Sequence, residues 1–243
     1  KSELELAAHW ARTRMEGKTL QNVCVVVPDL ASRAAEVRRV FLDVFAANWR
    51  SAQQSREAVN LSYGEALANK PRVATALNLL KLCQGIQNYT TISLALRSPF
   101  LRSGRAEAEQ RAQLDLRLRE RLGAEYFATE ARPYAQTIAP EFATVLAGID
   151  AATTDLSKRS LANWAEWITG FLQNAGWPGE DELDSVAFQE LDAWNRLLND
   201  FAASSKIHSL VDFQAARSLL ERLTRNRLHQ PQDQRLYKAN HPD

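Results

Sequence analysis

Residues 161–175 read LANWAEWITGFLQNA, and this stretch carries the clearest pattern in the chain. Its apolar side chains recur at alternating spacings of three and four residues, which places them on one face of a helix over about four turns. These side chains are Leu161, Trp164, Ala165, Ile168, Phe171, Leu172 and Ala175. A glycine and proline turn, Gly176-Trp177-Pro178-Gly179, follows and ends the run. The pattern predicts an amphipathic helix that packs into a helical core.

The same periodicity extends through most of the chain on both sides of this stretch. Pro71 suits a first helical position, and an apolar stripe at helical spacing follows it as far as Cys83. Charged pairs such as Glu107–Arg111, four residues apart, predict a solvent-facing side on the helix that carries them. Further helices are predicted over Tyr89–Leu96, over Arg105–Leu122, from Pro140, over Phe188–Phe201 and over Ala216–Leu223.

The beginning of the chain follows a different pattern. A helical stretch from Leu4 to Met15 precedes Val23-Cys24-Val25-Val26-Val27, a β-branched run typical of a strand buried on both faces. A helix is predicted over Leu30–Ala47 and a short second strand over residues 59–62. Two strands make a poor domain by themselves, so we expect one β-α-β unit of an incomplete sheet.

The predicted fold class is therefore mainly α. A helical domain at residues 71–229 follows a partial α/β segment at residues 1–70, and a polar tail occupies residues 230–243.

Bulk composition excludes several classes of protein. The chain is 45% hydrophobic and 24% charged, and its net charge of +1 provides no general basic field for nucleic acid. No apolar run approaches a membrane span and the basic, polar start is no signal peptide, so we expect a cytoplasmic protein without membrane contact. Cys24 and Cys83 are predicted to be buried free thiols. A first residue of Lys1 rather than Met predicts a start inside a longer protein.

Two short motifs have the residue types of catalytic sites but the wrong order. Gly17-Lys18-Thr19 resembles the end of a phosphate-binding loop, but the glycine that the motif needs is Arg12. Glu16-Gly17-Lys18 and Pro28-Asp29 contain the residues of a PD-(D/E)xK nuclease in reverse order. We therefore predict no catalytic residue in this chain.

Other groups that can carry chemistry also lack the required spacing. The four histidines, at positions 9, 208, 229 and 241, share no ligand spacing with the cysteines, so no metal site is predicted. Glu180, Asp181, Glu182 and Asp184 are interpreted as a solvated helix start that complements the helix dipole.

Several segments together resemble a known family. Residues 6–12 (LAAHWAR) with residues 23–30 (VCVVVPDL) are similar to the start of the second motor domain of AddB-like proteins, a branch of the superfamily 1 helicases. Residues 60–67 (NLSYGEAL), followed by Pro71-Arg72-Val73, resemble the next strand and helix of that domain. Residues 94–101 (LALRSPFL), continued by residues 111–115, resemble the LLRSPF element of the family, and the turn at residues 176–179 is similar to a further block.

The resemblance implies a piece of a bacterial DNA repair protein, a helicase with a C-terminal PD-(D/E)xK exonuclease domain. In such proteins a helical insertion, the 2B subdomain, interrupts the second motor domain. The resemblance also implies that this chain needs no cofactor of its own, whereas the parent hydrolase uses ATP and Mg²⁺. The implied partners of the parent are DNA and a helicase–nuclease subunit. No catalytic residue carries over, because no position here matches one.

Four arginines near the Arg-Ser-Pro-Phe element are the candidates for DNA contact: Arg97, Arg102, Arg105 and Arg111. Two of them also have a structural interpretation, Arg111 as the partner of Glu107 and Arg97 as a helix cap. The alternative function is a helical protein–protein interaction module without a DNA role, which a broad exposed apolar face on the helix of residues 161–175 would favour.

Overall fold

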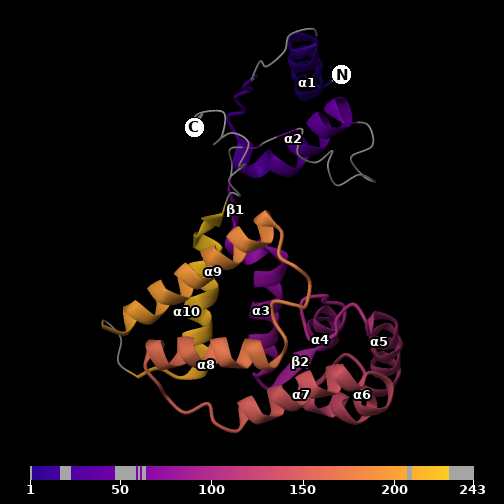
Figure 1. The fold of residues 1–243 in the computed structure, drawn as a ribbon, viewed down its shortest axis with the longest axis vertical. Coiled ribbons are helices and arrows are strands. Elements are labelled where there is room, and N and C mark those ends of the chain that lie inside the picture. Colours follow the sequence, from indigo (N-terminus) through magenta and orange to yellow (C-terminus); the bar gives the residue numbers. More distant parts are fainter. Residues whose placement is uncertain are drawn as a thin grey trace. The chain divides into compact units, whose positions relative to one another are not determined.

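A computed structural model describes residues 2–16, 23–46, 59, 61, 64–206 and 210–229. The chain divides into two compact units, residues 1–64 and residues 65–243, and each is described by itself. The predicted mainly α fold is confirmed, since helices dominate both units (Figure 1). No helix in the described part of the chain combines the length and the apolar character that crossing a bilayer requires.

Two helices form the described core of the first unit. Helix α1 (Glu3–Met15) begins at a capping box in which Ser2 accepts from the amide of Glu5, and α2 (Leu30–Phe45) packs against it. Both helices were predicted at nearly these bounds. Their apolar faces meet at residues that include Leu4, Ala8 and Phe41.

The prediction that residues 23–27 form a strand buried on both faces is wrong in two respects. The segment is extended but has no strand partner among the described residues. Only alternate side chains, those of Val23, Val25 and Val27, pack against the two helices, whereas Val26 is 85% exposed. The segment is thus buried on one face. Of the second predicted strand, over residues 59–62, the structure describes only Val59 and Leu61, and neither is in a strand. The predicted polar tail at residues 230–243 lies outside the described residues.

The cysteine prediction is half confirmed. Cys83 is buried, but Cys24 is exposed because it faces away from α1 and α2. Burial raises the pKa of the Cys83 thiol to about 12. We therefore expect one thiol per native chain to react with a chromogenic disulfide at neutral pH and a second to react after denaturation. Cys24→Ser should abolish the native reaction; equal rates for both thiols in the native protein would contradict this.

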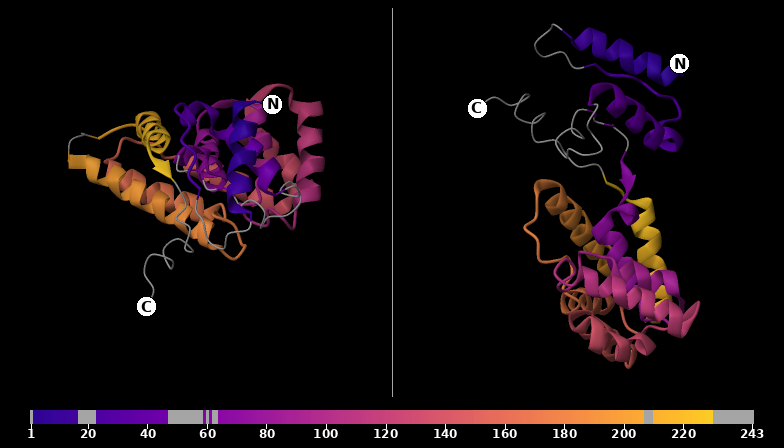
Figure 2. Two further views of the ribbon diagram at one scale, coloured as in Figure 1. Left: turned by 90° about the horizontal axis from the view of Figure 1, so that it is seen from above. Right: turned by 90° about the vertical axis from the view of Figure 1, so that its right-hand side faces the viewer.

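The second unit is a helical domain. Its helices are α3 (Pro71–Leu82), α4 (Tyr89–Leu96), α5 (Ala108–Leu122), α6 (Arg132–Ile138), α7 (Pro140–Thr153), α8 (Leu161–Asn174), α9 (Ser185–Ala203) and α10 (Phe213–Asn226). Short 3₁₀ helices lie at η2 (Leu67–Asn69), η3 (Ala128–Ala131) and η4 (Ser204–Lys206). Helix α3 contacts both α4 and α9, and α8 packs along α9 (Figures 1 and 2).

The apolar stripe predicted at residues 161–175 lies in the core of this unit, with every one of its side chains buried. Trp164 is at its centre and donates from its indole Nε1 to the carbonyl oxygen of Val211 at 3.0 Å. Trp167 and Phe213 pack against the Trp164 ring. One correction concerns α9, because Phe188, predicted on its buried stripe, is exposed.

Two short antiparallel strand pairs join segments that are distant in the sequence. Strand β2 (Ile86–Asn88) pairs with β3 (Glu125–Phe127), and β1 (Glu65–Ala66) pairs with β4 (Leu228–His229). In the second pair Ala66 faces Leu228, and the amide of Leu67 donates to the carbonyl oxygen of Arg227 at 2.8 Å. The chain therefore enters and leaves the helical unit at adjacent strands (Figure 1). We call this pair the neck.

The neck also determines where the two units divide. Residues 65–70, predicted to belong with the front segment, pack with the helical unit instead. Leu67 is fully buried in the helical core, and η2 contacts α3 and α10. The division therefore falls between Gly64 and Glu65.

Candidate functional site

Two loops of the helical unit pack directly against each other and form the candidate site. The first, residues 98–105, connects α4 to α5, and the second, residues 176–181, connects α8 to α9. The amide of Arg102 in the first loop donates to the carbonyl oxygen of Ala175, at the end of α8, at 2.9 Å. We call these loops the loop platform.

Glycine is required where the two loops approach most closely. Gly176 has a φ of +77°, and a Cβ atom there would lie 2.5 Å from the amide nitrogen of Arg102. Gly179 has a φ of +103°, and its Cβ position lies 3.2 Å from the Cα atom of Phe100. The turn at residues 176–179 is therefore shaped to fit the Arg-Ser-Pro-Phe loop.

Trp177 ties the loop platform to two helices. Its Nε1 donates to the carbonyl oxygen of Arg72, in the first turn of α3, at 2.9 Å. Its ring meets that of Trp194 on α9 edge to face, with centroids 5.7 Å apart. The Trp177–Pro178 peptide bond is cis. One aromatic side chain thus connects the turn to α3 and α9.

The first turn of α3 is held by a buried carboxylate. Glu190 of α9 accepts from the amide of Arg72 at 3.0 Å, and the guanidinium of Arg72 lies 3.8 Å from its other oxygen. Burial raises the pKa of Glu190 above its ordinary value. The same guanidinium lies over the Phe100 ring, 4.6 Å from its centroid. Arg72 therefore links α3, α9 and the first loop.

A second buried carboxylate holds the start of α7 in the same way. Glu107 accepts from the amides of Glu141 and Phe142 at 2.8 and 2.9 Å, and from the Nε of Arg111 at 3.0 Å. The prediction that this pair lies on a solvent-facing helix side is wrong, because the Arg111 and Glu107 side chains are 1% and 7% exposed. The carboxylate faces inward because the helix that begins at Pro140 leaves amides without helical acceptors.

The four candidate arginines occupy very different environments. Arg111 is buried, donates to the carbonyl oxygen of Arg102 and lies over the Phe142 ring, and burial lowers its pKa. Arg102 is half-buried. Arg97 and Arg105 are exposed. Because Arg111 is 1% exposed, its side chain is not accessible to a DNA strand in this structure. DNA contact by Arg97, Arg102 and Arg105 stays a prediction.

Both exposed arginines also have contacts within the chain. Arg97 is the C-cap of α4 and donates from Nε to the carbonyl oxygen of Ser93 at 3.2 Å, as its structural interpretation predicts. Arg105 forms an ion pair with Asp181 at 2.7 Å, in which the side chains are 69% and 40% exposed. Such an exposed pair is weak, so the guanidinium can exchange partners.

The acidic cluster after the turn is used within the fold. Asp184 caps α9 by accepting from the amide of Ala187 at 2.7 Å, which confirms its prediction as a helix start. Glu180 accepts from the amide of Ser103 at 2.9 Å. Three acidic residues, with Asp181, therefore stabilise the helix start and the loop platform.

The motifs set aside in the sequence lie only partly within the described residues. Among the described residues no group of three or more histidine, cysteine or acidic side chains is placed to hold a metal ion. Asp29 precedes α2 and forms no side-chain capping bond. Residues 17–19 lie outside the described residues.

Sequence reasoning missed the roles of Glu107 and Glu190. One signal was available: Pro71 and Pro140 begin helices whose next amides need acceptors, and both acceptors are carboxylates from other parts of the chain. Sequence spacing gives no means of choosing which glutamate supplies them.

Comparison of the chain with protein-family models, with curated proteins and with solved structures finds no match.

Proposed function

We propose that residues 65–229 form a helical insertion in the second motor domain of a bacterial, AddB-like DNA repair protein. In this proposal the insertion guides a DNA strand or packs against the motor or a partner subunit in the cytoplasm. ATP hydrolysis and Mg²⁺-dependent cleavage belong to other segments of the parent.

The neck is the observation that carries the proposal. An inserted domain must leave and rejoin its host at nearby points, and closely spaced ends are what make insertion tolerable. Here β1 and β4 pair antiparallel, with Glu65 opposite His229 and Ala66 opposite Leu228. The helical unit can therefore extend from a host sheet without disturbing it.

The loop platform supports the resemblance from which the proposal starts. The family-like blocks at residues 94–101 and 176–179 are far apart in the sequence but lie against each other in the fold, where Gly179 approaches Phe100. Gly176 approaches Arg102, directly after the first block. Sequence blocks that belong to one structural element are expected to meet in this way.

The extended segment of the first unit supports the proposal that a sheet of the host is incomplete in this chain. Cys24 and Val26 are exposed on the face of the extended segment opposite the one that packs on α1 and α2. A segment with apolar side chains on both faces is typical of a parallel strand that helices cover on two sides. Further strands of the host would complete such a sheet.

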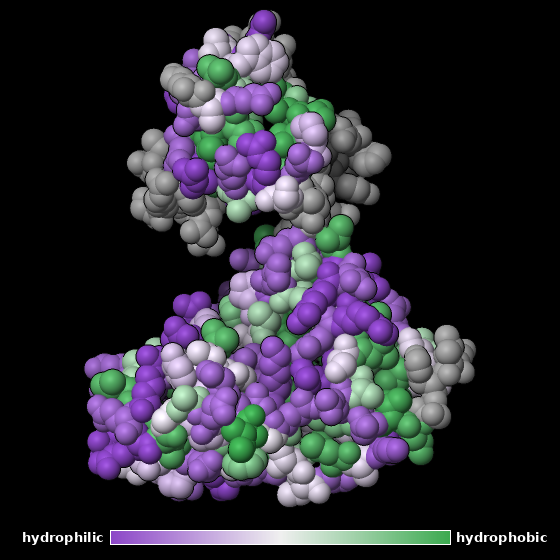
Figure 3. Space-filling model, turned by 180° about the vertical axis from the view of Figure 1, so that it is seen from behind, coloured by the Kyte–Doolittle hydropathy of each residue, from purple (hydrophilic) through white to green (hydrophobic). Residues whose placement is uncertain are grey.

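The alternative function, a protein–protein interaction module, would be favoured by a broad exposed apolar face on α8, and the structure has no such face. The apolar face of α8 is buried in the core and presents no broad exposed surface. On the face seen from behind in Figure 3, apolar residues of the helical unit lie in patches among hydrophilic ones. The DNA-handling proposal therefore stays ahead of it.

Charge reversal of two exposed arginines, Arg105 in the loop platform and Arg97 directly before it, tests the proposal. In the Arg97→Glu/Arg105→Glu variant we expect the slope of log affinity for forked DNA against log salt to fall by about two, one for each lost phosphate contact. Fluorescence anisotropy at several potassium chloride concentrations measures this slope.

Arg196→Glu/Arg225→Glu is the matched control. Both of these arginines lie outside the platform, are 72% and 70% exposed, and pair with acidic residues on their own helices. The control changes the net charge equally and should leave the slope unchanged. Equal losses in both variants would show a general charge effect and remove the platform from the proposal.

A further inference from the structure

A hollow between the start of α8 and the exposed side of α10 contains no residue of the loop platform. Its volume is about 230 Å³. The side chains that line it come from both helices and from the residue before the cap of α10: Leu161, Val211, Ala215, Ser218, Leu219 and Arg222. The DNA proposal uses none of these residues.

The lining of this hollow includes both buried apolar side chains and exposed polar ones. Leu161 is 1% exposed, and Val211 and Leu219 are half-buried. Ser218 and Arg222 are exposed and lie four residues apart, so their side chains are neighbours on one face of α10. A matching ligand therefore has an apolar part and a polar group at one end.

The charge of Arg222 indicates what this polar group is. Arg222 is the only charged residue of the lining, and its guanidinium forms no ion pair or hydrogen bond within the part of the chain that the structure describes. The carboxylates nearest in sequence have other partners. Glu221 pairs with two arginines of its own helix, and Asp212 caps α10 by accepting from the amide of Ala215 at 2.8 Å. We therefore expect the ligand to be an anion.

The wall at Val211 is held in place before any ligand binds. Its amide donates to the carbonyl oxygen of Arg159 at 2.9 Å, and its own carbonyl oxygen accepts from the amide of Arg159 at 3.0 Å. The same carbonyl oxygen accepts from the Nε1 of Trp164 at 3.0 Å. A preformed wall loses little conformational freedom on binding, which favours affinity. The indole N–H signal of Trp164 also reports on any change at this wall.

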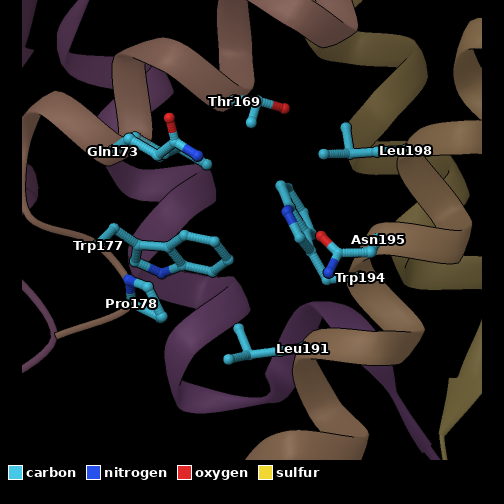
Figure 4. A pocket seen from close by; sticks show the side chains of 9 residues that line it. Thr169, Gln173, Trp177, Pro178, Leu191, Trp194, Asn195 and Leu198 are labelled. Carbon is cyan, nitrogen blue, oxygen red and sulfur yellow. The ribbon is translucent and has the colours of Figure 1, made fainter. Parts of the chain in front are cut away.

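A different hollow, between α8 and α9, provides a contrast (Figure 4). Its polar side chains carry no charge and include Thr169, Gln173 and Asn195. The rings of Trp177 and Trp194, which also line it, contact each other with centroids 5.7 Å apart. No charged residue of that lining selects an anion, so its signals provide the reference in a titration.

We propose that the hollow between α8 and α10 binds a carboxylate carried on a short branched aliphatic chain. The aliphatic part packs against Leu161, Val211 and Leu219, and the carboxylate accepts hydrogen bonds from Arg222 and Ser218. Such a group occurs in small aliphatic acids and at the C-terminus of a peptide that ends in leucine. The inference does not depend on the DNA role of the loop platform.

The apolar part of the lining favours this ligand over a free phosphate ion. The guanidinium of an arginine binds carboxylates and phosphates alike through paired hydrogen bonds. Only a ligand with an apolar part also gains from removing the surface of Leu219 and its neighbours in the lining from water. The aliphatic chain therefore supplies selectivity, and the carboxylate supplies the match to Arg222.

Nuclear magnetic resonance of the whole ¹⁵N-labelled chain tests the inference, with 4-methylpentanoate as the probe. We expect saturable shifts of the Val211 and Leu219 amide signals and of the Trp164 indole signal. The amide signals of Thr169 and Asn195, in the other hollow, should stay in place. The uncharged 4-methylpentanamide and inorganic phosphate should each bind at least about tenfold more weakly, because each lacks one of the two recognised parts.

Arg222→Gln should lower the affinity for 4-methylpentanoate about tenfold, which corresponds to about 1.4 kcal/mol. Arg225→Gln is the matched control, because it removes a 70% exposed arginine from the same helix outside the hollow. The affinity of this control should equal that of the wild type. Ala215→Leu fills the hollow, leaves every charge in place and should abolish binding.

A peptide that ends in leucine distinguishes the two sources of the carboxylate. Tighter binding of this peptide than of 4-methylpentanoate would assign the hollow to a protein C-terminus, and the reverse order would assign it to a small acid; both orders support the inference. Unmoved signals at millimolar probe would overturn it. Equal affinities for the acid and its amide, or equal losses in Arg222→Gln and Arg225→Gln, would overturn it as well.

Discussion

Replacement of Glu107 by alanine is expected to lower the free energy of unfolding of the helical unit by about 3–5 kcal/mol, the usual cost of removing one partner of a buried ion pair. The Arg111 guanidinium would stay buried without its counter-ion, and the amides of Glu141 and Phe142 at the start of α7 would lose their acceptor. Denaturant unfolding followed by tryptophan fluorescence measures this, because most tryptophans belong to the helical unit.

Glu109→Ala is the matched control for that variant. Glu109 stands two residues further along the chain, in the first turn of α5, and is exposed. Its loss should change stability by less than about 0.5 kcal/mol. If the two alanine variants unfolded at the same denaturant concentration, the buried carboxylate would have no role in joining α5 to α7.

Gly176→Ala is the second change for which we expect a large effect, a loss of about 3 kcal/mol or more. Its φ of +77° is strained for any side chain, which costs about 1–3 kcal/mol by itself. The new methyl group would also overlap the backbone of Arg102, at 2.5 Å from its nitrogen. The two loops of the platform would have to separate, so forked-DNA affinity should fall together with stability.

Gly170→Ala is a control for which we expect a change in stability of the opposite sign. Gly170 lies inside α8, and a Cβ atom there meets nothing within 4 Å. Alanine should therefore stabilise the helix by about 0.5–1 kcal/mol. A loss of stability at position 170 as large as that at position 176 would contradict the close approach of the loops.

The helical part of the fold could be predicted because its signal is local. The side chains of residues 161–175 alternate between core and solvent with the period of one helix, and the seven apolar side chains of the predicted stripe are buried. Helix α4 begins and ends where the sequence places it, at Tyr89 and Leu96, because Asn88 caps its start and Pro99 follows its end. Periodicity and capping residues of this kind can be recognised from a short stretch of sequence, without knowledge of the rest of the chain.

The strands could not be predicted from the same kind of signal. Strands β1 and β4 have two residues each and pair across the whole helical unit, so no periodicity develops in either. The segment at residues 23–27 shows the opposite error, since β-branched residues are abundant there but no partner strand lies among the described residues. Strand formation depends on a partner, which composition does not reveal.

The candidate site was predictable in its parts but not in its assembly. The Arg-Ser-Pro-Phe element and the turn at residues 176–179 stand out in the sequence, yet nothing local shows that they touch. The burial of Arg111 also depends on α7, whose first turn lies some thirty residues away, as the contact between Glu107 and Phe142 shows. Charge spacing alone therefore predicts an exposed pair where the fold buries one.

Titration of the whole wild-type chain with forked DNA at rising salt tests the central claim most directly, with ATP hydrolysis and Mg²⁺-dependent cleavage followed in the same samples. The proposal predicts binding that weakens steadily with salt, without hydrolysis of ATP and without cutting of DNA. Absence of binding at the lowest salt would contradict the DNA-guiding role. Cleavage of linear DNA that Asp29→Asn abolishes would contradict the proposal equally, since that result would place a nuclease site within this chain.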